Sequence, residues 1–173
     1  MRLPLVLAAA VLLASCTNSS TDSDEPVVQG SGTSKLTLSN PPAHWKVLVD
    51  KSGFPVSMTV FNIPNRADPT GKESTNVVAA AYAAKSKEGQ DALRATKGRF
   101  VKTNLRTSRQ GEWDVESYSE IQGTTRYRIL DGTKTLSEKT LFVRFAWPVL
   151  PGNSPGYDAE MQHSFDRLLT QVQ

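Results

Sequence analysis

Cysteine, histidine and long apolar runs are scarce in this 173-residue chain, which has one Cys and two His. A single thiol has no partner for an intrachain disulfide. After residue 16 no stretch approaches the roughly 20 apolar residues that span a bilayer as a helix. Neither a Gly-x-Ser-x-Gly motif nor a glycine-rich phosphate loop occurs. These absences argue against a membrane-spanning domain, a serine hydrolase of that motif and a phosphate-cradling nucleotide site.

Charge is nearly balanced, with 20 Lys and Arg against 17 Asp and Glu. Proteins that bind nucleic acid usually carry a large basic excess gathered on one face. The small excess in this chain therefore does not indicate a nucleic-acid partner.

Chemically reactive side chains do not cluster in the sequence. His44 and His163 stand alone, without the neighbouring Cys, Asp or Glu residues of a zinc site or the partners of a catalytic triad. Glu112, Asp114 and Glu116 point to one face of a single expected strand, opposite a basic strand, so we interpret them as a cross-strand charge ladder. The sequence thus predicts a protein that is not an enzyme and that holds no metal and no cofactor.

The first 16 residues have the layout of a signal peptide: a positive start, an apolar segment from Leu3 to Leu13, and small residues before Cys16. The segment Leu13-Ala14-Ser15-Cys16 resembles the lipobox of bacterial lipoproteins. That resemblance implies cleavage before Cys16 and attachment of a diacylglyceryl group to its thiol. In Gram-negative members of that family, a residue other than Asp directly after the cysteine implies transport to the outer membrane. This chain has Thr17 at that position, so the resemblance implies an outer-membrane location facing the periplasm if the host is Gram-negative.

Two other interpretations of Cys16 stay open. The first is an ordinary secretory signal that is cut after Ala10 or Ala14, and the second is a buried structural cysteine. Lipidation explains best why an exported chain keeps one unpaired cysteine. We therefore divide the chain into a signal peptide at 1–15, an acylated flexible tether at 16–34, which is rich in Ser, Thr, Gly and acidic residues, and a single domain at 35–173.

Alternation of apolar and polar residues predicts several strands in the domain. Their ranges are 35–38, 45–49, 56–63, 99–107, 112–121, 124–130 and 139–147. An alanine-rich segment over 77–87 predicts a helix because alanine has the highest helix propensity, and 90–96 extends it toward Gly98. Apolar residues three to four apart predict a closing helix over 158–172.

Two turns are expected from local sequence. Arg109-Gln110-Gly111 predicts a three-residue hairpin loop that places Arg106 opposite Asp114 and Leu105 opposite Val115. Asp131-Gly132 predicts a tight turn between two further strands. Short loops of this kind allow only antiparallel pairing.

The predicted fold class is α+β, with an antiparallel sheet of about six to seven strands covered by two or three helices. Two segments, Asn40-Pro41-Pro42-Ala43-His44-Trp45 and the run from Leu141 to Pro148 before the closing helix, resemble the PsbP/DcrB-like superfamily. The resemblance covers 35–173 and implies an α-β-α sandwich. That superfamily includes small envelope lipoproteins, photosynthetic extrinsic subunits and secretion chaperones, most of which act by binding and share no active-site motif.

Two exposed segments are candidates for binding a partner. The segment 85–109 is locally basic, and within it Lys85, Lys87, Lys97 and Arg99 are not assigned to the charge ladder. The proline-rich segment 148–157 offers Leu150 and Tyr157 as anchors, although they are equally compatible with packing under the last helix.

The sequence therefore predicts an envelope lipoprotein that is held to the membrane through acylated Cys16 and that binds a protein partner without catalysis. A periplasmic immunity or inhibitor protein and an accessory subunit of an envelope complex are its two concrete forms. The alternative is a carrier of a lipid or other apolar ligand, which requires an apolar pocket of about 300–1,000 Å³ between sheet and helices.

Overall fold

Seven antiparallel strands form the main sheet of the protein, in the order β3-β4-β5-β9-β8-β7-β6. The computed structural model describes residues 27–31, 35–39, 44–68, 70 and 72–172. The strands are β1 (Val27–Ser31), β2 (Lys35–Ser39), β3 (Lys46–Lys51), β4 (Val56–Pro64), β5 (Ser74–Ala83), β6 (Thr103–Gln110), β7 (Trp113–Gln122), β8 (Thr125–Thr135) and β9 (Lys139–Pro148). The helices are α1 (Lys87–Lys97) and α2 (Tyr157–Gln171).

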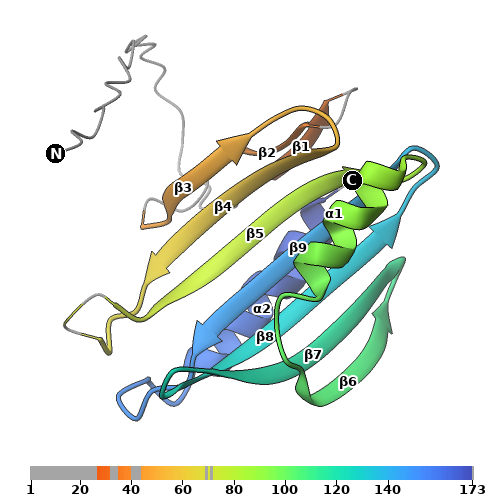
Figure 1. The fold of residues 1–173 in the computed structure, drawn as a ribbon. Coiled ribbons are helices and arrows are strands. Elements are labelled where there is room, and N and C mark those ends of the chain that lie inside the picture. Colours follow the sequence, from red (N-terminus) through yellow and green to blue (C-terminus); the bar gives the residue numbers. More distant parts are fainter. Residues whose placement is uncertain (1–26, 32–34, 40–43, 69, 71, 173) are drawn as a thin grey trace, which may run out of the picture.

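The two helices lie on opposite faces of the sheet (Figure 1). A separate hairpin of β1 and β2 contacts α2 through β1, and β4 and β5 through β2. The segment 27–31, which falls within the predicted tether, is therefore a paired strand. Cys16 and the rest of the predicted signal lie outside the described residues.

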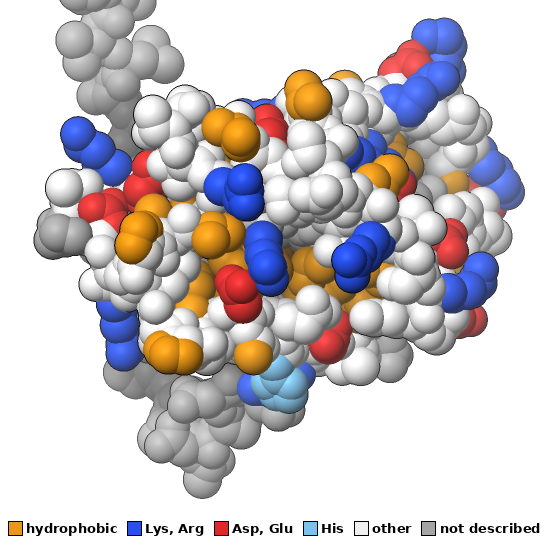
Figure 2. Space-filling view, turned by 90° about the horizontal axis from the view of Figure 1, so that it is seen from below, with side chains coloured by type: hydrophobic (Ala, Val, Ile, Leu, Met, Phe, Trp, Pro, Cys, Tyr) orange, Lys and Arg blue, Asp and Glu red, His pale blue; other side chains and the backbone are white. Residues whose placement is uncertain are grey.

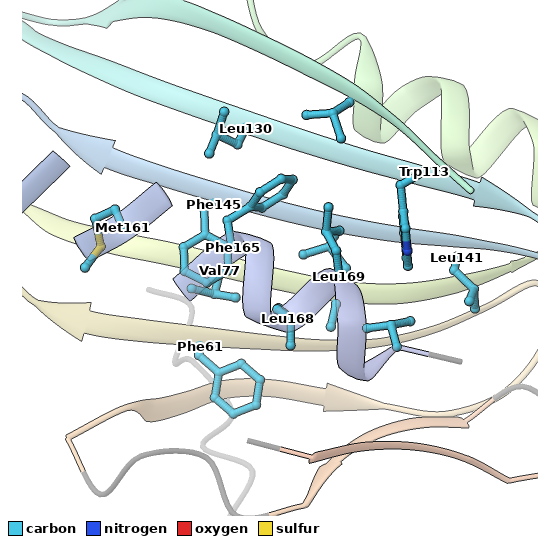
Figure 3. Close-up of a cluster of buried hydrophobic side chains, with 14 of the residues drawn as sticks. Phe61, Val77, Trp113, Leu130, Leu141, Phe145, Met161, Phe165, Leu168 and Leu169 are labelled. Carbon is cyan, nitrogen blue, oxygen red and sulfur yellow. The ribbon is translucent and has the colours of Figure 1, made fainter. Parts of the chain in front are cut away.

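The larger core lies between the sheet and α2 (Figure 3). Alternate residues of the central strands point into it, and Val77, Leu141, Val143 and Phe145 have no exposed surface. Phe165 of α2 packs edge-on against Phe145, with ring centroids 5.9 Å apart. Burying one side chain of this size contributes about 1.5–3 kcal/mol. Because the cluster on this face contains more buried residues than the clusters on the opposite face, it supplies most of the hydrophobic stabilisation.

The opposite face is smaller and is covered in part by α1. Tyr82 and Phe142 pack edge to face with centroids 6.3 Å apart, and Ala92 and Leu93 of α1 lie against them. Tyr82 also shares a 2.8 Å hydrogen bond with Thr96 in the last turn of α1. Ser86 caps the start of α1 by accepting the backbone N–H of Gly89 at 2.9 Å.

A buried ion pair joins β8, β9 and α1 on this face. Arg144 donates to both carboxylate oxygens of Asp131, at 2.6 Å each, and both side chains are almost fully buried. Arg144 also donates to the backbone carbonyl of Thr96 at 3.0 Å, which attaches the end of α1 to the sheet. Tyr118 completes the network by donating to Asp131 at 2.9 Å, and burial, followed by the charge of Asp131, raises the pKa of its hydroxyl.

The predicted helix over 77–87 is wrong, because residues 77–83 belong to the central strand β5. Alanine propensity is a weak preference that tertiary packing overrides. Ala79 and Ala81 face the α2 core and Ala80 faces α1, so both faces of the strand are buried. Small residues suit this position because they leave room for neighbouring aromatic rings. The helix begins only at Lys87 and ends at Gly98, the expected stop.

Both turn predictions are also wrong: the first turn lies at other residues than predicted, and the second predicted turn is part of a strand. The β6–β7 hairpin turns at Gly111 and Glu112, where Gly111 has φ +58°, and it pairs Arg109 with Asp114. Asp131-Gly132 lies in the middle of β8. At Gly132 α2 approaches the strand closely, because an added Cβ would lie 2.7 Å from Leu169 Cδ2 and 3.3 Å from Phe165 Cζ.

The predicted α-β-α sandwich of PsbP/DcrB type, with two or three helices covering the sheet, is contradicted. The protein is mostly β, and its described residues form two short helices, one on each face of a seven-stranded sheet. Many of the residues predicted to be helical belong to strand β5. The helix α1 covers only part of the face of the sheet on which it lies (Figure 1). The antiparallel sheet itself is present, as are the expected strands β4 and β9 and the closing helix α2.

We expect Gly132→Ala to lower the free energy of unfolding by about 1–3 kcal/mol, because the new methyl group overpacks the contact between β8 and α2. Gly156→Ala is the matched control, since a Cβ there has no neighbour within 4 Å. Urea denaturation of both variants measures the difference. Equal stability of the two variants would contradict this role for Gly132.

We expect Asp131→Asn to lower the free energy of unfolding by about 3–5 kcal/mol, because it leaves Arg144 charged and uncompensated in the interior. Asp91→Asn removes a partner of exposed ion pairs and should change the free energy by only about 0–1 kcal/mol. Chemical denaturation checks both values. A loss below about 1 kcal/mol for Asp131→Asn would show that the pair does not hold the sheet and α1 together.

Candidate functional site

The four basic residues singled out from the sequence do not form one site. Lys85 pairs with Glu138, Lys87 pairs with Asp91, and Lys97 lies 3.5 Å from Glu116. All three are thus at least partly neutralised by acidic neighbours. Arg99 lies beside the Phe100 ring, with its guanidinium carbon 5.8 Å from the ring centroid, and lines a hollow next to α1.

The two apolar anchors on 148–157 also have different surroundings. Tyr157 is half-buried against the main core, and its hydroxyl is 2.8 Å from that of Thr75. Burial raises the pKa of this hydroxyl. Leu150 is half-buried in a turn closed by a 3.1 Å hydrogen bond from the Asn153 N–H to its carbonyl. Both residues are thus half-buried, and Tyr157 packs against the main core.

The acidic residues of β7 and its turn contact basic residues. Glu112 pairs with Lys134, Asp114 with Arg109 at 3.4 Å, and Glu116 with Lys102. For Glu112 a hydrogen bond from Lys134 lowers the pKa of the carboxyl group. His44 and His163 are exposed, and the part of the chain that the structure describes contains no group of His, Cys, Asp or Glu residues able to hold a metal ion.

A different set of basic residues does converge, in a groove on the face of the sheet that carries α2. Arg106 comes from β6, Arg126 and Arg128 come from β8, and we call the groove between them and α2 the arginine groove. It has a volume of about 560 Å³. Ser117 and Ser119 of β7 are part of its lining.

Strand pairing explains how these residues meet. Arg126 and Arg128 are two apart in β8, so they point to the same face. Arg128 lies opposite Ser119, and Arg106 lies opposite Ser117, which places small side chains between the arginines. The first turns of α2, with Asp158, form the other wall of the groove.

The charge of the groove is positive. Its lining contains three arginines and one acidic residue, Asp158, so the formal sum is +2. Asp158 accepts a 2.8 Å hydrogen bond from the Trp147 indole N–H and lies 2.9 Å from Arg128. Among the described residues, Arg106 and Arg126 have no acidic neighbour within ion-pair distance. The positive end of the α2 dipole adds to the same potential.

This arrangement is suited to binding an anion. Arginine presents a planar fork of donors that matches a carboxylate or a phosphate in a bidentate way. Ser117 and Ser119 could act as nucleophiles only with an adjacent base, and the groove lining contains no histidine. The geometry is therefore suited to recognition of acidic groups.

Sequence reasoning missed this groove. The signal that was available is the alternation Arg126-Tyr127-Arg128, which puts two positive charges on one face of an expected strand. Arg106 was assigned to the charge ladder through an incorrect hairpin register, and the contribution of α2 depends on tertiary packing.

The end of the molecule with the 64–74 and 148–157 connections carries exposed apolar side chains between separate positive and negative ones (Figure 2). No helix among the described residues is long and apolar enough to cross a membrane.

Comparisons with known proteins identify no family for this chain. No protein-family model matches the chain, and no curated protein sequence matches it. A crystal structure from Bacteroides thetaiotaomicron VPI-5482 is similar over 70% of this chain and 41% of its own, with 17% identity and a TM-score of 0.38. The chain thus matches less than half the length of that protein.

We expect the double variant Arg106→Gln, Arg126→Gln to keep its free energy of unfolding within about 0.5 kcal/mol of the parent value, because both side chains are exposed and the described structure gives them no ion pair. Thermal or urea denaturation measures this. A loss above about 2 kcal/mol would show that the arginines hold the fold together and do not serve a ligand.

Proposed function

We propose that the protein is a lipid-anchored envelope lipoprotein that binds an acidic protein partner through the arginine groove and performs no catalysis. The observation that carries the proposal is the convergence of Arg106, Arg126 and Arg128 on one groove that contains a single acid, Asp158. Such a concentration of unbalanced charge suits a partner with carboxylate side chains.

The anchor rests on the resemblance of the first 16 residues to a lipobox. Acylated Cys16 would hold the domain at the membrane, because each buried CH₂ group of an acyl chain contributes about 0.8 kcal/mol. In a Gram-negative host the domain would lie in the periplasm, attached to the outer membrane. No role for nucleic acid, a metal or a cofactor is proposed.

Two forms of this function fit the same groove. In an immunity or inhibitor protein, the groove would cover an acidic surface of a toxin made for the same compartment. In an accessory subunit, it would dock onto an acidic surface of an envelope complex. Both require a stoichiometric partner, and both predict that binding weakens as salt screens the charges.

Affinity purification of the full-length protein from detergent-solubilised native membranes tests the proposal. We expect the parent protein to recover a stoichiometric partner, and the Arg106→Gln, Arg126→Gln variant to recover at least tenfold less, since two charge-assisted contacts are lost. Arg94→Gln with Arg109→Gln is the matched control, because these arginines are exposed but lie outside the groove.

The amount of partner recovered by the groove variant and by the control decides whether the arginine groove binds the partner. Equal recovery by the groove variant and the control, or no stoichiometric partner with the parent protein, would contradict the proposal. Binding of the purified protein to an acidic peptide should weaken with added salt, and the slope should be shallower for the groove variant because fewer charges are involved.

A further inference from the structure

A second hollow lies on the opposite face of the sheet, where α1 leaves the strands uncovered (Figure 1). It has a volume of about 690 Å³ and extends from β4 to β7 below the end of α1. Ligand pockets in proteins commonly measure about 300–1,000 Å³. This hollow, which we call the α1 hollow, is therefore large enough for a small ligand.

Apolar side chains line much of the α1 hollow. Met58, Val60 and Val78 are only half-buried, although they sit on central parts of the sheet where strands are usually covered. Phe100, in the connection after α1, and Ala146 extend this lining. An apolar surface left open on the face of a sheet is suited to the apolar part of a ligand.

Two of the polar groups of the hollow already have partners within the protein. Arg144 is held by Asp131 and by the Thr96 carbonyl, and the Tyr127 hydroxyl donates to Glu73. Their hydrogen-bonding capacity is thus taken up by the protein. A ligand in the hollow would meet their apolar surfaces more than their donors.

Glu120 carries a carboxylate oxygen that the part of the chain described by the structure leaves without a donor. Its Oε2 atom is shielded from solvent and has no hydrogen-bond partner among the described residues, and its carboxyl group belongs to the lining of the hollow. Burial raises the pKa of this carboxyl group, although a hydrogen bond with Gln122 and the charges of Arg144 and Arg99 act in the opposite direction. A shielded acceptor without a donor is unfavourable, and a water molecule or a ligand that donates a hydrogen bond to it removes that cost.

We propose that the α1 hollow binds an amphiphile, with its apolar body on Met58, Val60 and Val78 and a hydroxyl or ammonium head group donating to Glu120. A donor head satisfies the unpaired oxygen of Glu120, whereas a carboxylate head would contact Arg99, which also lines the hollow, so the two kinds of head group distinguish the two contacts. This is a ligand site of the kind that the carrier alternative requires. It goes beyond the proposed partner binding, since it uses the other face of the sheet.

Displacement of the fluorescent probe N-phenyl-1-naphthylamine by three amphiphiles of equal chain length tests the proposal. We expect dodecylamine and dodecan-1-ol to displace the probe from the full-length protein at concentrations about tenfold lower than dodecanoate. In Glu120→Gln the advantage of the amine should fall by about tenfold, while the alcohol, which a glutamine oxygen still accepts, should keep its affinity.

Two further variants separate the α1 hollow from the rest of the surface. Val60→Trp fills the hollow and should abolish probe binding, whereas Val101→Trp changes a residue that is 77% exposed and does not line it. Circular dichroism establishes that each variant is folded. If Val60→Trp is unfolded, Val78→Trp replaces it.

Several results would overturn the proposal: no probe binding by the parent protein, equal displacement by dodecanoate, or an unchanged amine preference in Glu120→Gln. A dodecanoate preference that disappears in Arg99→Gln would assign the head-group contact to Arg99 and would also overturn it. None of these results bears on the arginine groove, because the Arg106→Gln, Arg126→Gln variant leaves the α1 hollow intact.

Discussion

The ion pair between Asp131 and Arg144 determines how one face of the sheet is organised. It links β8 to β9 and, through the Thr96 carbonyl, attaches the end of α1 to both. Phe100 and Phe142 flank the guanidinium group, with centroids 4.7 and 5.1 Å from its carbon. Because both charges lie in the interior, removing either partner leaves an unpaired charge in a low dielectric. The position of α1, and with it the extent of the α1 hollow, depends on this pair.

The sheet keeps two different surfaces apart. On the α2 face, aromatic and branched side chains form a well-filled core, and the arginine groove lies at its margin beside the start of α2. On the α1 face, a shorter helix leaves half-buried apolar residues beside an unpaired carboxylate oxygen. One surface is thus suited to acidic groups and the other to an apolar body with a donor. A domain held at a membrane by Cys16, as we propose, would present both surfaces to the same compartment.

The sequence allowed the elements with clear periodicity to be predicted, namely the strands β2, β3, β4, β7 and β9 and the helix α2. The predictions were wrong where a residue type that is typical of one structure serves another structure in this protein. Alanines that favour a helix instead make room on both faces of β5, and the pair Asp131-Gly132, typical of a turn, provides a buried ion-pair partner and a close contact with α2. The arginine groove could not be assembled from the sequence, because its residues come from four strands and a helix. The basic segment 85–109 was predicted as a binding surface, but acidic residues distant in the sequence, such as Glu138 beside Lys85, neutralise much of its positive charge.

Hydrogen–deuterium exchange of the full-length protein, measured with and without a saturating polyglutamate peptide, tests most directly whether the arginine groove is the recognition surface. The account predicts slower exchange in β6, β7, β8 and the first turns of α2, with no change in α1. It also predicts that this protection is lost in the Arg106→Gln, Arg126→Gln variant. Protection confined to α1 or to β3, or protection that the variant retains, would contradict it.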